Sequence, residues 1–90
     1  MAKYLITADP IATFQPRFDT TLRLMAELRA RAIDVDYCDL LACDPHRASA
    51  DYLAALPVHS VVRADPARQP CVDLGPRRLA DARDYAVLIH

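Results

Sequence analysis

The fold is decided by residues 3–40, KYLITADPIATFQPRFDTTLRLMAELRARAIDVDYCDL. Residues 3–8 form a short apolar run, which predicts a strand buried on both faces, as parallel strands usually are. Asp19 offers a helix N-cap, and apolar residues at spacings of three and four predict an amphipathic helix over residues 20–32. Residues 33–40 alternate apolar and polar side chains, which predicts a strand with one polar face. Strand, helix and strand in this order predict a β-α-β unit.

The second half of the chain predicts shorter elements, which follow from turn residues and local alternation. They are a short helix from Ser49 through Leu56, a hairpin of residues 58–63 and 69–74, one or two helical turns within residues 77–84, and a final buried strand at residues 85–89. No repeat or linker interrupts them. We therefore expect a single domain over residues 1–90.

Composition excludes several classes of function. A charged fraction of 26% with a net charge of −1 gives no electrostatic basis for binding nucleic acid. The single glycine, Gly75, excludes the glycine-rich loops that cradle nucleotide phosphates. No apolar run approaches the ~20 residues that membrane insertion requires. Because the N-terminus carries no cleavable signal pattern, we expect a cytoplasmic protein.

Three short motifs give the first half a family likeness. An Asp-Pro-Ile turn lies at residues 9–11, Asp-Thr-Thr opens the helix at residues 19–21, and a Leu-Met pair follows at residues 24–25. With the second strand at residues 35–40, they resemble the start of prokaryotic glutathione synthetase. Residues 79–90, LADARDYAVLIH, resemble the family's Leu-Ala-Asp-x-Asp segment and the strand after it.

The resemblance implies a fold class. In that family this region is the pre-ATP-grasp domain, a Rossmann-like α/β layer that precedes the catalytic ATP-grasp domains. We therefore expect a mainly parallel sheet with one long helix, a hairpin and short helices. The first strand should lie in the centre, between the second strand and the final one.

The first candidate site is a loop rim formed by Asp9, Gln15, Arg17 and Asp19. Open α/β sheets bind ligands at the carboxyl ends of their strands, where Asp9 lies. Asp9 and Pro10 equally suit an Asx turn that needs no ligand, and we favour this structural interpretation. Arg17 has the geometry to bind a carboxylate in a bidentate manner, although a solvated loop arginine is the simpler interpretation.

Cysteine and arginine residues suggest two further sites, and in both cases we favour the structural alternative. Cys38, Cys43 and His46 have the spacing C-x₄-C-x₂-H, and Cys71, His59 or His90 could supply a fourth metal ligand. This spacing is looser than that of structural zinc sites. We expect the cysteines to be small buried side chains, with no metal and no cofactor. Arginines 77, 78 and 83 have acidic neighbours, which is typical of a solvated mixed-charge surface.

A sheet with apolar strands needs cover on both faces. The sequence supplies one long helix, so we expect a second face that a partner covers. The expected interface is the final strand, through Tyr85, Val87, Leu88 and Ile89. The partner would be a larger protein or another copy of the chain.

These observations lead to one functional hypothesis and two alternatives. We expect a stand-alone, non-catalytic relative of the glutathione synthetase N-terminal domain that acts as an accessory or assembly subunit. The first alternative is the N-terminal part of a whole or split glutathione synthetase, an ATP-dependent ligase that joins γ-glutamylcysteine and glycine. The second is a module that binds a small ligand at the loop rim. No catalytic residue is assigned in this chain.

Overall fold

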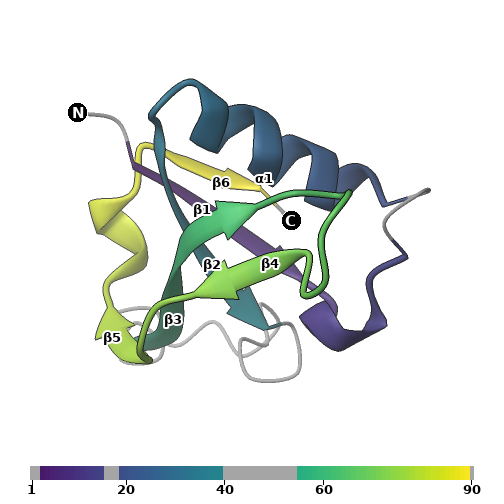
Figure 1. Ribbon diagram of the computed structural model, residues 1–90. Helices are drawn as coiled ribbons and strands as arrows, with labels where there is room; N and C mark the ends of the chain where they lie inside the picture. The colour runs from purple at the N-terminus through teal and green to yellow at the C-terminus, as the bar shows by residue number, and fades with distance from the viewer. Residues whose placement is uncertain (1–2, 16–18, 40–54, 90) are drawn as a thin grey trace.

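The computed structural model describes residues 3–15, 19–39 and 55–89 (Figure 1). These residues form an α/β domain in which one α-helix lies across one face of a six-stranded sheet. The strands are β1 (Lys3–Ala8), β2 (Asp34–Asp39), β3 (Leu56–Ala64), β4 (Val72–Leu74), β5 (Arg78–Ala80) and β6 (Val87–Ile89). The helix is α1 (Thr20–Ala30), and two 3-10 turns are η1 (Ile11–Thr13) and η2 (Ala82–Asp84).

The sheet is mixed, so the expectation of a mainly parallel sheet was wrong. Its order is β4-β3-β2-β1-β6, and β5 also pairs with β3. β1 is parallel to both β2 and β6, whereas β3 is antiparallel to β2, β4 and β5. β1 lies between β2 and β6, as expected. The direction of β3 was missed because an alternating pattern looks the same whichever way a strand runs.

The second half of the chain contains the predicted hairpin and one further correction. β3 and β4 pair with Val61 opposite Leu74, and the backbone N–H of Asp65 donates to the carbonyl of Cys71 at 2.8 Å across the turn. Of the helical turns expected within residues 77–84, one is present as η2, whereas residues 78–80 form strand β5 instead. Of the helix predicted over residues 49–56, Leu56 begins β3 and residues 49–54 lie outside the described residues.

α1 begins where the sequence predicts because Asp19 caps it. The Asp19 carboxylate accepts a hydrogen bond from the backbone N–H of Leu22 at 3.1 Å, which satisfies one of the unpaired amides of the first turn. Leu22, Met25 and Leu28 are buried against Ile6 and its neighbours on the sheet. Burying side chains of this size contributes roughly 1.5–3 kcal/mol each, so this face holds the main core.

The helix ends two residues earlier than expected, at Ala30. Ala32 has a φ of 57°, in the left-handed region. The backbone N–H of Ile33 donates to the carbonyl of Leu28, and that of Ala32 donates to the carbonyl of Arg29, both at 3.0 Å. This is the Schellman pattern, which usually has glycine at the left-handed position.

The face opposite α1 has a smaller core of its own. Its buried members are Leu5, Cys38, Leu56, Val58 and Tyr85. Tyr85 belongs to the segment that links β5 to β6, so the chain itself covers part of the face that was expected to need a partner. Leu88, on β6, nevertheless remains 60% exposed.

Candidate functional site

The loop rim at the carboxyl end of β1 is held by local structural bonds. The backbone carbonyl of Asp9 accepts a hydrogen bond from the Tyr37 hydroxyl at 2.8 Å. The backbone carbonyl of Gln15 accepts one from the N–H of Asp19 at 2.9 Å, and the Asp19 side chain caps α1. Arg17 lies outside the described residues. These bonds hold the rim backbone and the start of α1, and both the Asx turn at Asp9 and the use of the rim as a ligand site stay predictions.

Tyr37 links the rim to the core under α1. Tyr37 is only 3% exposed, and it is one of the buried members of the main core. Burial raises the pKa of its hydroxyl to about 12, and the negative charge of Asp39 adds to the shift. Tyr37 is therefore a neutral hydrogen-bond donor at physiological pH.

A charged cluster lies on the other face of the sheet, around Asp36. The Asp36 side chain is 2% exposed, and its Oδ2 accepts hydrogen bonds from Nη2 of Arg78 and from the Tyr85 hydroxyl, the latter at 2.6 Å. Nζ of Lys3 lies 3.7 Å from the same oxygen. A buried carboxylate needs such partners, because an unpaired charge in the interior is strongly destabilising. We call Lys3, Asp36, Arg78 and Tyr85 the Asp36 cluster.

The Asp36 cluster also fixes the protonation of Tyr85. Burial raises the pKa of the Tyr85 hydroxyl, and the hydrogen bond to the Asp36 carboxylate raises it further, while the charge of Arg78 opposes the shift. Nζ of Lys3 lies 5.9 Å from the centre of the Tyr85 ring, within the range of a cation–π contact. Arg78 also donates to the Ser60 hydroxyl at 3.2 Å, which ties the cluster to β3.

The structure separates the four residues of the expected interface. Tyr85 is buried in the Asp36 cluster, and Ile89 packs against the main core under α1. Val87 is half-buried, and Leu88 points to the opposite face of the sheet, in register with Leu5. Leu88 therefore offers the largest exposed apolar surface among these four residues, and the interface itself stays a prediction.

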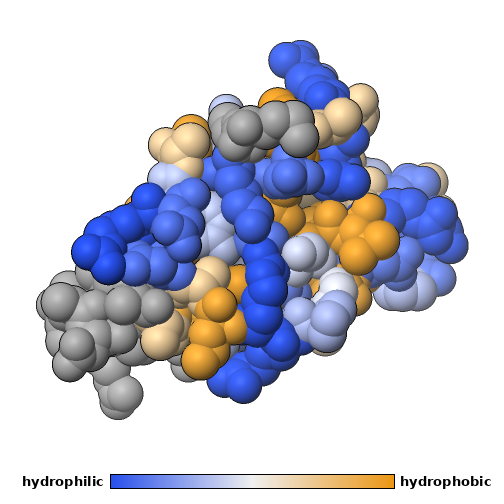
Figure 2. Space-filling model, turned by 90° about the vertical axis from the view of Figure 1, so that its left-hand side faces the viewer, coloured by the Kyte–Doolittle hydropathy of each residue, from blue (hydrophilic) through white to orange (hydrophobic). Residues whose placement is uncertain are grey.

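The exposed apolar side chains are spread over the surface. Val62, Leu79 and Leu88 are the large ones in the described part of the chain. On the face shown in Figure 2, apolar areas are divided by a hydrophilic band. Scattered apolar residues are normal on a protein surface. Leu88 on β6 and Leu79 on β5 both lie on strands that pair on one side in the described residues, whereas Val62 lies on β3, which pairs with three strands.

A cavity opens where β2 and β3 part. Their pairing ends at Asp36 and Ser60, and a space of about 340 Å³ follows, lined by both strands and by Lys3 and Arg29. The charged side chains around it pair with one another: Lys3 with Asp36, and Arg29 with Asp34 at 3.6 Å. The cavity is therefore lined by ion pairs, and we assign no ligand to it.

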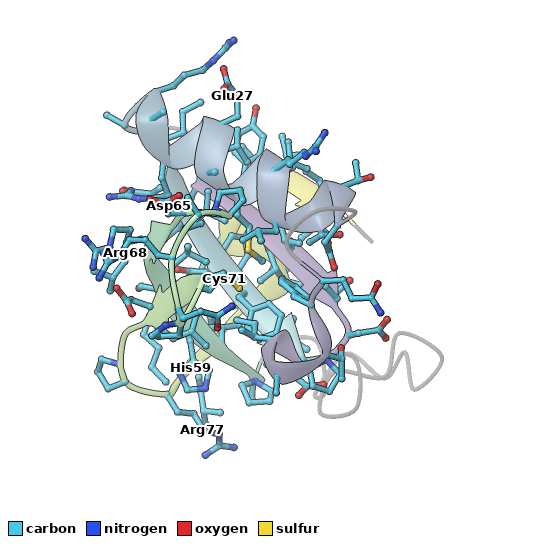
Figure 3. The ribbon with its side chains drawn as sticks, turned by 45° about the vertical axis from the view of Figure 1, so that its right-hand side comes forward. Glu27, His59, Asp65, Arg68, Cys71 and Arg77 are labelled. Atoms are coloured by element: carbon cyan, nitrogen blue, oxygen red, sulfur yellow. The ribbon has the colours of Figure 1, made fainter. Side chains whose placement is uncertain are left out.

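The possible metal site is not assembled in the described residues. Cys38 and Cys71 are both buried, as the sequence predicts, and Cys71 is free. His59 Nδ1 lies 2.8 Å from the carbonyl oxygen of Gly75, and Figure 3 shows it well away from Cys71. Cys43 and His46 lie outside the described residues. Within residues 3–15, 19–39 and 55–89, no three His, Cys, Asp or Glu side chains form a group suited to a metal ion.

The comparison with protein families now identifies the domain. The family described as "Prokaryotic glutathione synthetase, N-terminal domain" matches residues 2–89. The chain belongs to this family. No curated protein and no solved structure matches it. In the described part of this glutathione synthetase N-terminal domain, no helix has the length and apolar character to cross a membrane.

Sequence reasoning missed the Asp36 cluster of this glutathione synthetase N-terminal domain. Alternation in residues 33–40 places Asp36 on the polar face of its strand, and the arginines near residue 78 looked like a solvated surface. The structure buries Asp36 because Tyr85 and Arg78 return beneath β2 from the far end of the chain. No local signal distinguished Asp36 from Asp34 and Asp39 on the same strand, because the partners of Asp36 lie 42 and 49 positions away.

Proposed function

We propose that this domain is a non-catalytic accessory subunit of an ATP-grasp ligase of the glutathione synthetase type. Its role is to bind the larger ATP-grasp portion and to complete that fold, while the reacting groups come from the partner. Membership of the glutathione synthetase N-terminal family over residues 2–89 carries this proposal. We expect the complex in the cytoplasm, where ATP is available.

The β6 strand supports the proposal as a docking edge. β6 lies at one end of the sheet order, with β4 at the other, and pairs with β1 on one side. The open side of a terminal strand presents backbone donors and acceptors that another chain can satisfy. Leu88 adds an apolar side chain on the same strand, at 60% exposure.

A second candidate is the N-terminal part of a glutathione synthetase. The same family membership favours it. In this case the domain and the ATP-grasp portion together join γ-glutamylcysteine and glycine at the expense of ATP. The two candidates differ in whether the assembled complex makes glutathione.

Co-expression with the ATP-grasp portion of a prokaryotic glutathione synthetase tests both candidates. We expect a stable complex on size-exclusion chromatography, with a dissociation constant measurable by calorimetry, that the Leu88→Asp variant loses. Supplying ATP, magnesium, γ-glutamylcysteine and glycine then decides the function. Glutathione in the product supports the synthetase, and a complex without ligation supports the accessory subunit. If the two proteins elute separately, both candidates are wrong.

A further inference from the structure

A single carboxylate oxygen joins three separate segments of the chain. Oδ2 of Asp36, on the central strand β2, accepts from Tyr85 and Arg78 and lies near Nζ of Lys3. Lys3 begins β1, Arg78 begins β5, and Tyr85 lies two residues before β6. The Asp36 cluster therefore fixes both ends of the segment that leads from β5 into β6.

Besides the packing of Ile89 against the main core, β6 is held by its pairing with β1. It is three residues long and pairs with β1 over Tyr4, Leu5 and Ile6. The backbone N–H of Ala86 donates to the carbonyl of Lys3 at 2.9 Å, and the hydroxyl of Thr7 donates to the carbonyl of Ile89 at 3.3 Å. A strand this short gains little from its own ladder, so the buried bond to Tyr85 at its entrance is a large part of what holds it.

We propose that Asp36 is a positioning residue for the β6 edge, acting through the Tyr85 hydroxyl. The carboxylate holds Tyr85 beneath β2, and Tyr85 sets where the chain enters β6 and how Leu88 is presented. This inference rests on the proposed docking function of β6. It adds that docking depends on a group that is 2% exposed and unable to touch the partner.

The effect on partner binding follows from the fraction of molecules in which β6 is formed. If β6 is fully formed only part of the time, the apparent dissociation constant for the partner rises in inverse proportion to that fraction. Weakening the Asp36–Tyr85 bond lowers the fraction and leaves every contact residue unchanged. A purely structural role for Asp36 predicts a different result, in which the whole domain unfolds more easily and docking by the folded molecules stays the same.

The test uses Tyr85→Phe, which keeps the ring and removes the hydroxyl, with Asp36→Asn as a second variant. Arg83→Ala is the matched control, because Arg83 forms an exposed pair with Asp81 close to Tyr85 in the sequence. Hydrogen exchange measures opening of residues 86–89 against opening of α1. Calorimetry measures affinity for the co-expressed ATP-grasp portion.

We expect exchange of residues 86–89 to become about tenfold faster in Tyr85→Phe, the loss that one charge-assisted hydrogen bond produces, while α1 is unchanged. Affinity should fall in the ratio of the formed fractions of β6 in the two proteins, which the same exchange data give, and the control should match the wild type. Equal acceleration in α1 and β6, or unchanged exchange in β6, overturns the positioning role. If Asp36→Asn fails to fold, the exchange and affinity of Tyr85→Phe still test the positioning role. If exchange changes as expected but the wild type binds no partner, the positioning of β6 stands and the proposed function fails.

Discussion

The hydroxyl of Tyr85 donates a hydrogen bond to Oδ2 of Asp36 at 2.6 Å, across 49 positions of the chain. Asp36 belongs to the β-α-β unit at the start of the domain, and Tyr85 to the segment that returns to β6. Both groups are buried, so neither can satisfy its polar atoms with bulk water. The bond therefore ties the last strand of the sheet to its centre.

Replacing Arg78 with Ala should destabilise the domain far more than replacing Arg83. Arg78 pairs with a buried carboxylate, and its loss leaves Asp36 with a weaker set of partners. We expect a loss of about 2–3 kcal/mol in the free energy of unfolding, measured by urea titration. Arg83→Ala removes the exposed pair with Asp81 and should leave the urea midpoint close to that of the wild type. Equal midpoints for the two variants would show that Asp36 does not depend on Arg78.

Leu88→Asp and Ile89→Asp should separate docking from folding. Leu88 is 60% exposed, so its replacement should leave the far-UV spectrum and the melting temperature nearly unchanged. Ile89 packs against the core under α1, so a carboxylate there should lower the melting temperature strongly or prevent folding. The two residues are neighbours on one strand, and the contrast tests the register of β6 on β1. A Leu88→Asp protein that is insoluble by itself would contradict this assignment.

Ala32→Gly should stabilise the domain. Ala32 has a φ of 57°, a conformation that costs an L-residue roughly 1–2 kcal/mol and costs glycine almost nothing. Part of this gain is offset by the greater freedom of glycine in the unfolded chain, so we expect a net gain of about 0.5–1 kcal/mol by chemical denaturation. Ala30→Gly is the control, since Ala30 is the last helical residue and glycine there should destabilise. A loss of stability in Ala32→Gly would argue against the left-handed helix end.

Tyr37 should make the domain sensitive to alkaline pH. Its pKa is about 12 in the folded protein and near 10 when unfolded, so the unfolded state loses the proton first. The stability that depends on the neutral hydroxyl is fully present below pH 10 and is lost as the pH rises toward 12. Tyr37→Phe should therefore differ most from the wild type below pH 10, and the difference should shrink between pH 10 and 12. Unfolding curves at pH 8, 10 and 11.5 measure this, and a constant difference would show that Tyr37 ionises normally.

Local sequence patterns were sufficient to predict the strands and the helix start in the first half of the domain. The apolar run at residues 3–8, the cap at Asp19 and the alternation after Ile33 predicted β1, the start of α1 and β2. Each of these signals acts within a few residues, through hydrogen bonds or side-chain spacing along one element. The family motifs at residues 9–11 and 19–21 lie in this half as well. The end of α1 was missed because alanine gives no sign that it will adopt a left-handed conformation at residue 32.

Longer-range features needed the tertiary structure. The direction of β3 depends on which neighbour it meets, and the burial of Asp36 depends on Tyr85 and Arg78, which reach it from the far end of the chain. The amino-acid sequence by itself determined which segments of the first half form helix and strand and to which family the chain belongs, because propensity, capping and motif spacing are properties of neighbouring residues. Only the folded chain decided that a polar residue would be buried and Leu88 exposed. Burial is set by what packs above a residue, and that comes from distant parts of the sequence.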